Sequence, residues 1–155
     1  MRSIRVCGSE VLLKESLEDD FGQYLVRALP ERCKVFVLTD SNVAPLYLSG
    51  LKSLLMALGF KVESFVVAPG EEGKTLWTAK KIYEFLSSRF ASRTDAILAL
   101  GGGVVTDLAG FVASTYLRGM KLINAPTSLL AMIDASIGGK NALNCAGLKR
   151  TYGIF

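Results

Sequence analysis

Four segments of the chain place glycine, acidic, amide or lysine residues directly after a strand-like run, where they could bind a ligand. They are residues 39–42, 69–75, 101–107 and 126–144. Glycine lets the backbone approach a ligand closely, and the N-terminus of a following helix offers unpaired N–H groups with a partial positive charge. The chemistry that these segments suggest is the binding of phosphate groups.

The strongest of the four signals is the run Ala96–Asp107, a buried-type strand that leads through three glycines into an apolar helix. A phosphate or pyrophosphate would fit at Gly101, Gly102 and Gly103, but a tight strand-to-helix turn explains the same glycines equally well. Asp107 stands in the first turn of the helix, so it either caps the helix or reaches a ligand.

Two further segments carry polar side chains after a predicted strand. Asp40 and Asn42 follow the run 35–39, and a carboxylate at such a strand end often binds ribose hydroxyls. The sequence alone nevertheless favours the alternative, in which Asp40 or Ser41 caps the next helix. Lys74 ends a glycine-containing loop just before another predicted helix. A loop lysine is usually solvated, and the neighbouring glycines favour a ligand contact.

The fourth segment surrounds a turn of small residues with charged ones. Asp134 and Lys140 flank this turn, and Lys149 follows nine residues later in another glycine-containing loop. Lysines that converge on one pocket bind phosphate and carboxylate oxygens as compact cations. An exposed loop explains one such lysine but not the whole constellation.

The distribution of charge points to the same class of ligand. Residues 1–107 hold 13 basic and 13 acidic side chains, whereas residues 108–155 hold five basic side chains and one acidic one, which accounts for the net charge of +4. These five cations are dispersed among small and apolar residues without aromatic interleaving, which disfavours nucleic acid. A small phosphorylated ligand fits better.

Composition excludes several classes of protein and of site. The 155 residues are 50% hydrophobic and 21% charged, which predicts one compact domain over residues 1–155. The chain contains no histidine, so triads built on imidazole and the usual catalytic zinc sites are excluded. Three scattered cysteines, Cys7, Cys33 and Cys145, lack metal-site spacing and are expected to be buried or incidental thiols.

No membrane segment is expected. Uncharged stretches such as Leu122–Ile133 have 12 residues, fewer than the roughly 18 to 20 that span a bilayer. The N-terminal residues lack the pattern of a secretory signal, so we expect a cytoplasmic protein.

Short β-branched runs alternate with longer amphipathic stretches, which predicts an α/β fold: a Rossmann-like parallel sheet with flanking helices. Strands of this sheet are expected at Ser3–Cys7, Lys34–Thr39, Lys61–Val67, Ala96–Leu100 and Lys121–Asn124. Helices are expected at Pro45–Leu58, Thr75–Phe90, Val104–Tyr116 and Thr127–Ile133. The last two are nearly all apolar and should be buried on most sides. Periodicity is lost from residue 134, so residues 132–155 are expected to begin a loop region.

Four motifs occur in this order: GEEGK at 70–74, GGGVVTDLAGFVASTYLRG at 101–119, PTSLLAMIDASIGGKNALN at 126–144 and GLKRTYGIF at 147–155. In order and spacing they resemble the N-terminal half of the 3-dehydroquinate synthase family, and the resemblance covers nearly the whole chain. The Asp-x-Ser-x-Gly-Gly-Lys arrangement at 134–140 favours this cyclase branch over the iron- or zinc-dependent glycerol and alcohol dehydrogenases of the same superfamily.

The resemblance implies an NAD-dependent lyase of the shikimate pathway. Such an enzyme converts 3-deoxy-D-arabino-heptulosonate 7-phosphate into 3-dehydroquinate and phosphate, and it recycles NAD within each turnover. The substrate is therefore a small phosphorylated sugar acid, and the full-length family forms homodimers.

The resemblance also implies the site residues. Those expected to contact NAD are Asp40, Asn42, Glu71, Lys74, Gly102, Gly103, Val104, Val105, Asp107, Thr127, Ser128, Lys140 and Lys149. The first four would lie on the adenosine side, the next four under the pyrophosphate and Asp107 near the nicotinamide. Asp134, Lys140 and Lys149 would be the catalytic residues that face the substrate, and Arg118 would reach the phosphate of a neighbouring subunit.

Three residues depart from the family pattern. Thr106 replaces a glycine, Asn141 replaces a threonine, and Arg150 replaces an asparagine. We expect Thr106 to add a side chain beside the pyrophosphate loop and so to weaken or redirect cofactor binding.

A catalytic metal is not expected in this chain. The family continues with a helical domain that supplies a glutamate and two histidines to zinc or cobalt, and these ligands are absent here. We therefore expect a truncated synthase that is not active alone. The alternatives are a non-catalytic nucleotide-binding module, half of a split enzyme, a related sugar-phosphate cyclase and a remnant without a stable fold.

Overall fold

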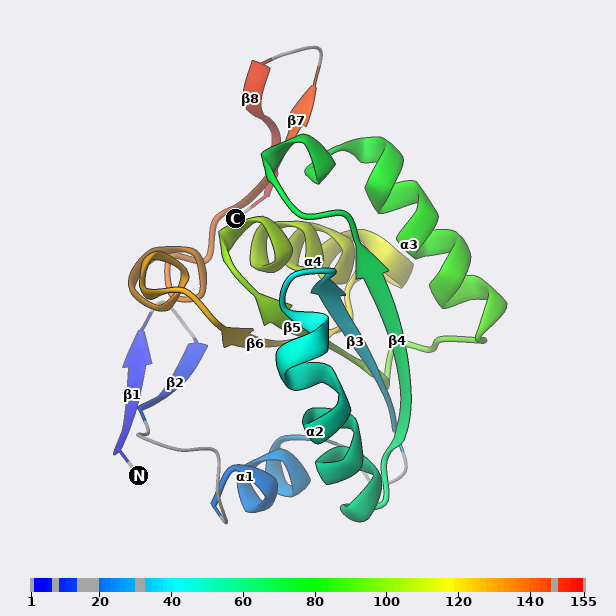
Figure 1. Cartoon of the computed structure of the whole chain (residues 1–155), viewed down its shortest axis with the longest axis vertical. Helices are drawn as coiled ribbons and strands as arrows, with labels where there is room; N and C mark the ends of the chain where they lie inside the picture. The colour runs from blue at the N-terminus through cyan, green and yellow to red at the C-terminus, as the bar shows by residue number, and fades with distance from the viewer. Residues whose placement is uncertain (1, 7–8, 14–19, 30–32, 146–147, 155) are drawn as a thin grey trace.

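A parallel four-stranded sheet with helices on both faces forms the centre of the molecule (Figure 1). The computed structural model describes residues 2–6, 9–13, 20–29, 33–145 and 148–154. The sheet has the order β4-β3-β5-β6, and all its strand pairs are parallel. Its strands are β3 (Lys34–Asp40), β4 (Lys61–Val67), β5 (Ala96–Gly101) and β6 (Lys121–Pro126). The predicted α/β class is confirmed.

The central strands are apolar throughout because both faces of the sheet are covered. All six residues of β5 are buried, and so are the five central residues of β3. Successive side chains point to opposite faces, so Phe36 and Ile97 belong to one hydrophobic cluster while Val37 and Leu98 belong to the other.

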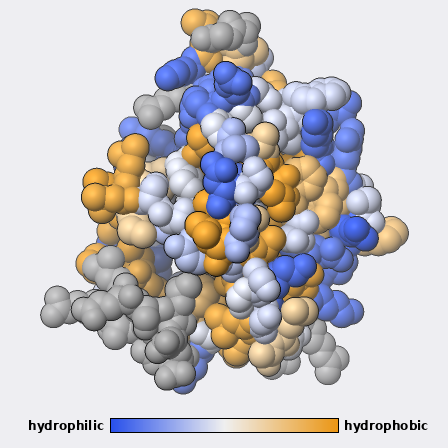
Figure 2. Space-filling model, viewed as in Figure 1, coloured by the Kyte–Doolittle hydropathy of each residue, from blue (hydrophilic) through white to orange (hydrophobic). Residues whose placement is uncertain are grey.

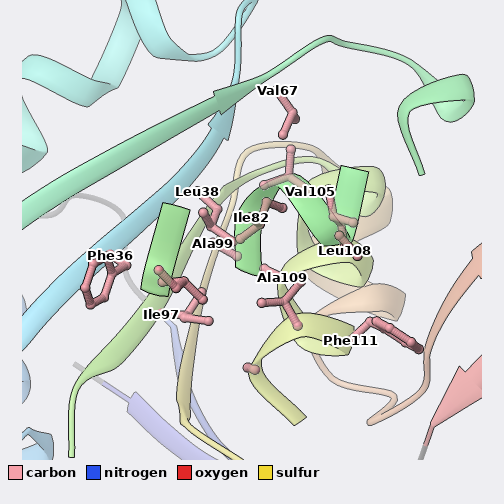
Figure 3. Packing of buried hydrophobic residues seen from close by; sticks show 14 of the residues in the cluster. Phe36, Leu38, Val67, Ile82, Ile97, Ala99, Val105, Leu108, Ala109 and Phe111 are labelled. Carbon is pink, nitrogen blue, oxygen red and sulfur yellow. The ribbon is translucent and has the colours of Figure 1, made fainter. Parts of the chain in front are cut away.

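Two helices pack on each face. The helices α1 (Asp20–Ala28) and α2 (Ala44–Ala57) contribute Leu25 and Leu55 to one cluster. The helices α3 (Leu76–Ser88) and α4 (Gly103–Thr115) contribute residues such as Ile82 and Leu108 to the other, as Figure 3 shows. The helices α2, α3 and α4 begin and end within two residues of their predicted bounds.

Helix α4 is almost entirely enclosed, as its apolar sequence predicts. Its buried residues are Val105, Thr106, Leu108, Ala109, Gly110, Phe111, Val112 and Ala113. One of them, Gly110, lets another element approach closely: a Cβ atom there would lie 2.1 Å from Oδ1 of Asn141.

That neighbouring element is a C-terminal hairpin of β7 (Asn141–Cys145) and β8 (Leu148–Ile154). The sequence predicts a loop here, because glycine and asparagine interrupt any periodic pattern. The strands form nevertheless, since β7 packs against α4 and places Leu143 in the core with no exposed surface.

The first predicted strand is wrong in its placement. Strand β1 (Arg2–Val6) pairs antiparallel with β2 (Ser9–Leu13) in a separate two-stranded sheet, and the predicted end at Cys7 lies outside the described residues. The physical reason is polarity: Ser3 and Arg5 are exposed, and such residues cannot fill a strand that is buried on both faces. Strand β2 and helix α1 were not predicted.

The predicted burial of the segment Thr127–Ile133 is also wrong. A helical segment does form over residues 129–135, with the π-helical turn η3 (Ala131–Ala135) as its last part, but Leu129 and Ile133 are 73% and 66% exposed. Figure 2 shows hydrophobic side chains at the left of the molecule, where this turn lies in Figure 1.

Within the described residues, no helix is long and apolar enough to cross a membrane.

Candidate functional site

The polar segments that follow the four parallel strands meet at one edge of the sheet. Strands β3, β4, β5 and β6 are all parallel, so their carboxyl ends lie together. The segments that begin there are residues 40–42, 70–75, 102–107 and 127–128. Ligands of open α/β sheets bind at this edge.

The turn between β5 and α4 is built around a glycine that no other residue can replace without a shift. A Cβ atom on Gly101 would lie 2.7 Å from the Cβ of Val105. Gly102 is the N-cap of α4, and among the described residues no side chain caps this helix end. The N–H groups of its first turn, which includes Val104 and Val105, therefore have no intrahelical acceptor.

The residues after β6 adjoin this glycine turn. The backbone N–H of Thr127 donates to the carbonyl of Gly101 at 3.0 Å. The hydroxyl of Ser128 lies 3.5 Å from the position that a Cβ on Gly102 would take, and it accepts a hydrogen bond from Ala131 N–H at 3.3 Å. The structure thus brings Thr127 and Ser128 to the predicted phosphate-binding turn.

Thr106 lies against the turn from inside the protein. Its side chain is fully buried, and its hydroxyl donates to the carbonyls of Gly102 at 3.3 Å and Gly103 at 3.1 Å. The residue therefore does not project from the edge of the sheet, which removes the steric reason for expecting it to obstruct a ligand there.

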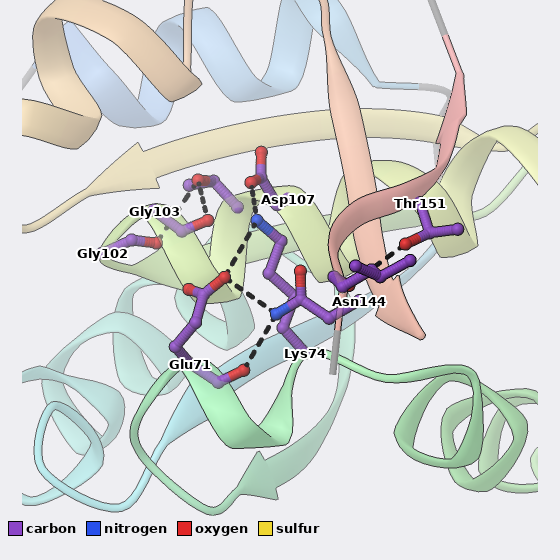
Figure 4. A network of polar contacts seen from close by, with 9 residues as sticks. Glu71, Lys74, Gly102, Gly103, Asp107, Asn144 and Thr151 are labelled. Carbon is purple, nitrogen blue, oxygen red and sulfur yellow. Dashed lines mark hydrogen bonds and ion pairs between the residues drawn. The ribbon is translucent and has the colours of Figure 1, made fainter. Parts of the chain in front are cut away.

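Lys74 is buried, contrary to the usual behaviour of a loop lysine. It follows a short helical turn, η1 (Glu71–Gly73), and only 3% of its surface is exposed. Its ammonium forms a short ion pair with Asp107 of α4 and lies 3.8 Å from Oε1 of Glu71 (Figure 4). Asp107 thus pairs with a lysine from the neighbouring loop and orients that lysine.

Asn144 joins the hairpin to the same loop. Its side-chain Nδ2 donates to Oε1 of Glu71 at 2.9 Å, and its backbone N–H donates to the carbonyl of Lys74 at 2.8 Å. A parallel bridge with Thr75 accompanies these bonds. Sequence reasoning did not single out Asn144, although it ends the motif at 126–144 and its amide is the available signal.

An open cleft of about 380 Å³ lies between this loop and the hairpin. The residues that line it are Glu71, Glu72, Thr75, Asn144, Cys145, Leu148 and Lys149. Lys149 and the loop of Glu71 line the same cleft, and so does Cys145, which the sequence did not suggest. Sγ of Cys145 lies 3.6 Å from Oη of Tyr152, and the interaction with Cys145 raises the pKa of Tyr152.

Asp40 has the local role at the start of the next helix that the sequence alone favours. Its Oδ1 accepts hydrogen bonds from the backbone N–H groups of Asn42 at 2.8 Å and Val43 at 3.0 Å. The carboxylate therefore holds the turn that leads into α2, and Asn42 is exposed beside it.

Three predicted residues are not brought to the cleft. Asp134 and Lys140 are exposed on either side of their turn. Arg118 is exposed in η2 (Tyr116–Arg118), beyond the carboxyl end of α4, a helix about 20 Å long that begins at the glycine turn. Leu117 and Arg118 both adopt left-handed backbone angles, with φ of 49° and 65°.

The described residues do not fit a metal. No group of three or more histidine, cysteine, aspartate or glutamate side chains among them could hold an ion.

Comparison with known proteins gives the family. The model of the 3-dehydroquinate synthase N-terminal domain matches residues 64–155. A 3-dehydroquinate synthase of Streptococcus pneumoniae is 50% identical over 134 residues, which cover 86% of this chain and 38% of that relative. The chain thus spans less than two fifths of the curated relatives that it matches.

Solved structures agree in fold. A crystal structure of 2-deoxy-scyllo-inosose synthase matches with a TM-score of 0.89 and 27% identity, over 99% of this chain and 44% of that one. Another structure of 2-deoxy-scyllo-inosose synthase, complexed with carbaglucose-6-phosphate, NAD+ and Co2+, matches with a TM-score of 0.80 and 30% identity, over 88% of this chain and 37% of that one. These matches, and the meeting of three of the four motifs at one edge of the sheet, lead to one conclusion: the chain belongs to the 3-dehydroquinate synthase family, of which it holds the N-terminal part.

Proposed function

We propose that this chain is the NAD-binding part of a cytoplasmic 3-dehydroquinate synthase, a lyase that forms 3-dehydroquinate and phosphate from 3-deoxy-D-arabino-heptulosonate 7-phosphate. The observation that carries the proposal is that three family motifs, at 70–74, 101–119 and 126–144, meet at the carboxyl edge of one parallel sheet, beside residues 40–42. Residues 1–155 would act as one domain, with residues 132–155 on the side of the substrate.

The residues at this edge fit NAD. Gly101 lets β5 and the start of α4 approach each other closely, and the uncapped start of α4 offers N–H groups to a pyrophosphate. At the end of β3, the fully buried hydroxyl of Thr39 has no hydrogen-bond partner among the described residues, so a polar group remains available there. NAD, when bound, supplies a reversible hydride acceptor.

The charged residues would have different roles toward the cofactor, the substrate and a neighbouring subunit. Lys74 holds Asp107 in place, so this carboxylate is fixed where the nicotinamide side of the site is expected. Lys149 and Lys140 would attract the phosphate and carboxylate oxygens of the substrate, and Asp134 would orient its hydroxyls. In a dimer, Arg118 would serve the neighbouring subunit, consistent with its exposed position away from the cleft.

Catalysis by this chain alone is not expected. Related cyclase structures contain Co2+ or Zn2+ beside NAD+, whereas the described residues of this chain include no group that could hold a metal. We therefore assign no step of the reaction to a metal held by this chain.

The direct test is a calorimetric titration of NAD into the chain, after circular dichroism shows that it is folded. We expect saturable binding of one NAD per chain. A folded chain that gives no heat of binding would overturn the proposal. Phosphate release from the heptulosonate phosphate in the presence of zinc or cobalt would overturn the further expectation that the chain is inactive alone.

Two other functions are favoured by specific observations. The match to 2-deoxy-scyllo-inosose synthase with bound carbaglucose-6-phosphate supports a related sugar-phosphate cyclase. The lack of a metal-binding group in the described residues supports a non-catalytic nucleotide-binding module or half of a split enzyme. Restoration of activity by a separately expressed histidine-bearing helical domain would distinguish a split enzyme from a binding module, and the preferred sugar phosphate would identify the cyclase.

A further inference from the structure

A continuous chain of polar contacts runs from the hairpin surface into the interior. Asn144 of β7 bonds to Glu71, Glu71 approaches Lys74, and Lys74 pairs with Asp107 of α4 (Figure 4). The Glu71 side chain is 43% exposed, whereas those of Lys74 and Asp107 are 4% and 15% exposed. Three segments that are far apart in sequence are therefore connected through one loop.

Distances within this chain show which contact orients Glu71. Oε1 of Glu71 is 2.9 Å from Nδ2 of Asn144 but 3.8 Å from Nζ of Lys74. The first distance is that of a good hydrogen bond, and the second is longer than one. The half-exposed carboxylate is therefore held by the amide of Asn144 more than by the lysine.

Asn144 also fixes the backbone of the loop. Its N–H donates to the carbonyl of Lys74 at 2.8 Å, and its Nδ2 lies 3.4 Å from the carbonyl of Glu71. One residue of the hairpin thus contacts both ends of the segment that carries the buried lysine.

We infer that Asn144 is a positioning residue for the cofactor loop. It holds the segment Glu71–Lys74 in the conformation in which Lys74 reaches Asp107, so the affinity for NAD depends on the docking of the hairpin. The inference rests on the proposed function, because NAD is the ligand expected at this loop.

The chemistry of the amide explains why this position needs asparagine. Its NH₂ group donates to Glu71 without adding charge, so Glu71 stays available to the nearby ammonium. Aspartate would place a second carboxylate against the first, and alanine would leave Glu71 free to turn toward solvent.

The experiment compares Asn144→Ala, Asn144→Asp, Glu71→Gln and the double variant Glu71→Gln/Asn144→Asp. The double variant exchanges donor and acceptor, since a glutamine amide can donate to an aspartate. Thr151→Val is the matched control: it removes a bond of the same hairpin, from Thr151 Oγ1 to the Leu148 carbonyl at 3.1 Å, that does not touch the loop. NAD affinity is measured by calorimetry, and loop order by hydrogen exchange of residues 71–75 without ligand.

We expect Asn144→Ala and Asn144→Asp to weaken NAD binding about tenfold and to speed exchange in the loop, as the loss of one charge-assisted hydrogen bond allows. The double variant should recover most of the affinity lost in Asn144→Asp, and the control should match the wild type. A merely structural role would lower the unfolding temperature without such a recovery.

Two results distinguish a failure of the inference about Asn144 from a failure of the proposed function. Wild-type affinity and exchange in Asn144→Asp would overturn the inference and leave the proposed function standing. If the wild type itself binds no NAD, the proposed function fails, and hydrogen exchange alone decides whether Asn144 orders the loop.

Discussion

At the scale of single residues, the ion pair of Lys74 and Asp107 sets the electrostatics of the site. Their side chains are 4% and 15% exposed, so the attraction between them is screened less than in a surface pair. The exposed pair of Lys80 and Glu84, with side chains 61% and 64% exposed at 3.7 Å, is the natural comparison within the same chain.

Removing one partner of the buried pair should destabilise the protein. We expect Lys74→Met to lower the free energy of unfolding in urea by about 2 to 3 kcal/mol, because Asp107 loses its counter-charge. The double variant Lys74→Met/Asp107→Leu should recover much of that loss. The control Lys80→Met should change stability by about 0.5 kcal/mol or less. Equal effects of Lys74→Met and Lys80→Met would contradict the role assigned to burial.

The cysteines should differ in reactivity. Burial, and next the charge of Asp95, raises the pKa of Cys33, which is only 5% exposed. A raised pKa leaves less thiolate at pH 8, so we expect alkylation of Cys33 to be at least about tenfold slower than that of Cys145 at the cleft. Peptide mapping after timed labelling measures both rates in the native chain, and equal rates would contradict the prediction. Cys7 lies outside the described residues.

At the scale of elements, the turn from β5 into α4 depends on the small size of one glycine. A Cβ on Gly101 would meet the β-branched Val105 at 2.7 Å, and a branched side chain within a helix has little freedom to move away. The strand and the helix that flank the candidate phosphate site can therefore approach each other only with glycine at this position.

Gly101→Ala should accordingly cost about 2 kcal/mol of stability through overpacking. The matched control is Gly50→Ala within α2, where no atom lies within 4 Å of the added Cβ. There the substitution should stabilise the protein by about 0.5 to 1 kcal/mol, because alanine favours a helix. Changes of opposite sign in the melting temperature of the two variants would support the close packing assigned to Gly101. A Gly101→Ala variant with unchanged stability would refute it.

Sequence alone predicts the elements of the central sheet well. The strands β3 to β6 and the helices α2 to α4 have strong apolar periodicity and clear end signals such as Gly59, which has φ of 87°. The hairpin β7–β8 has neither, and it is stabilised by packing on α4, which no local pattern encodes. Likewise, apolar composition predicts burial at Leu129, but burial also needs a neighbouring element that covers the side chain, and Leu129 is 73% exposed.

The candidate site could be predicted in part. Motif order and the rule for parallel sheets indicate that the segments around Asp40, Lys74 and Asp107 share one edge. The sequence does not reveal that Lys74 is buried against Asp107, because such a pair joins residues 33 positions apart. Thr106 shows the same limit: which way its side chain points depends on the packing of α4.

At the scale of the whole molecule, the exposed apolar turn near η3 should govern solubility. Leu129 and Ile133 are 73% and 66% exposed, and adjoining apolar side chains extend this patch. We expect Leu129→Ser/Ile133→Ser to raise the concentration at which the chain associates in sedimentation velocity, with little change in stability. Leu25→Ser, at a fully buried position, is the contrasting variant and should unfold the protein. Unchanged association in the double variant would show that this patch does not drive it.

The order of strands in the sheet also suits the direction in which a ribosome delivers the chain. Strand β3 emerges first, β4 joins one side of it, β5 joins the other side, and β6 adds to β5. Each strand therefore meets a partner that has already been synthesised, and no completed pair must open to admit a later one. The sheet can grow outward from β3 during translation, and the hairpin that contacts the cofactor loop is delivered after the sheet is complete.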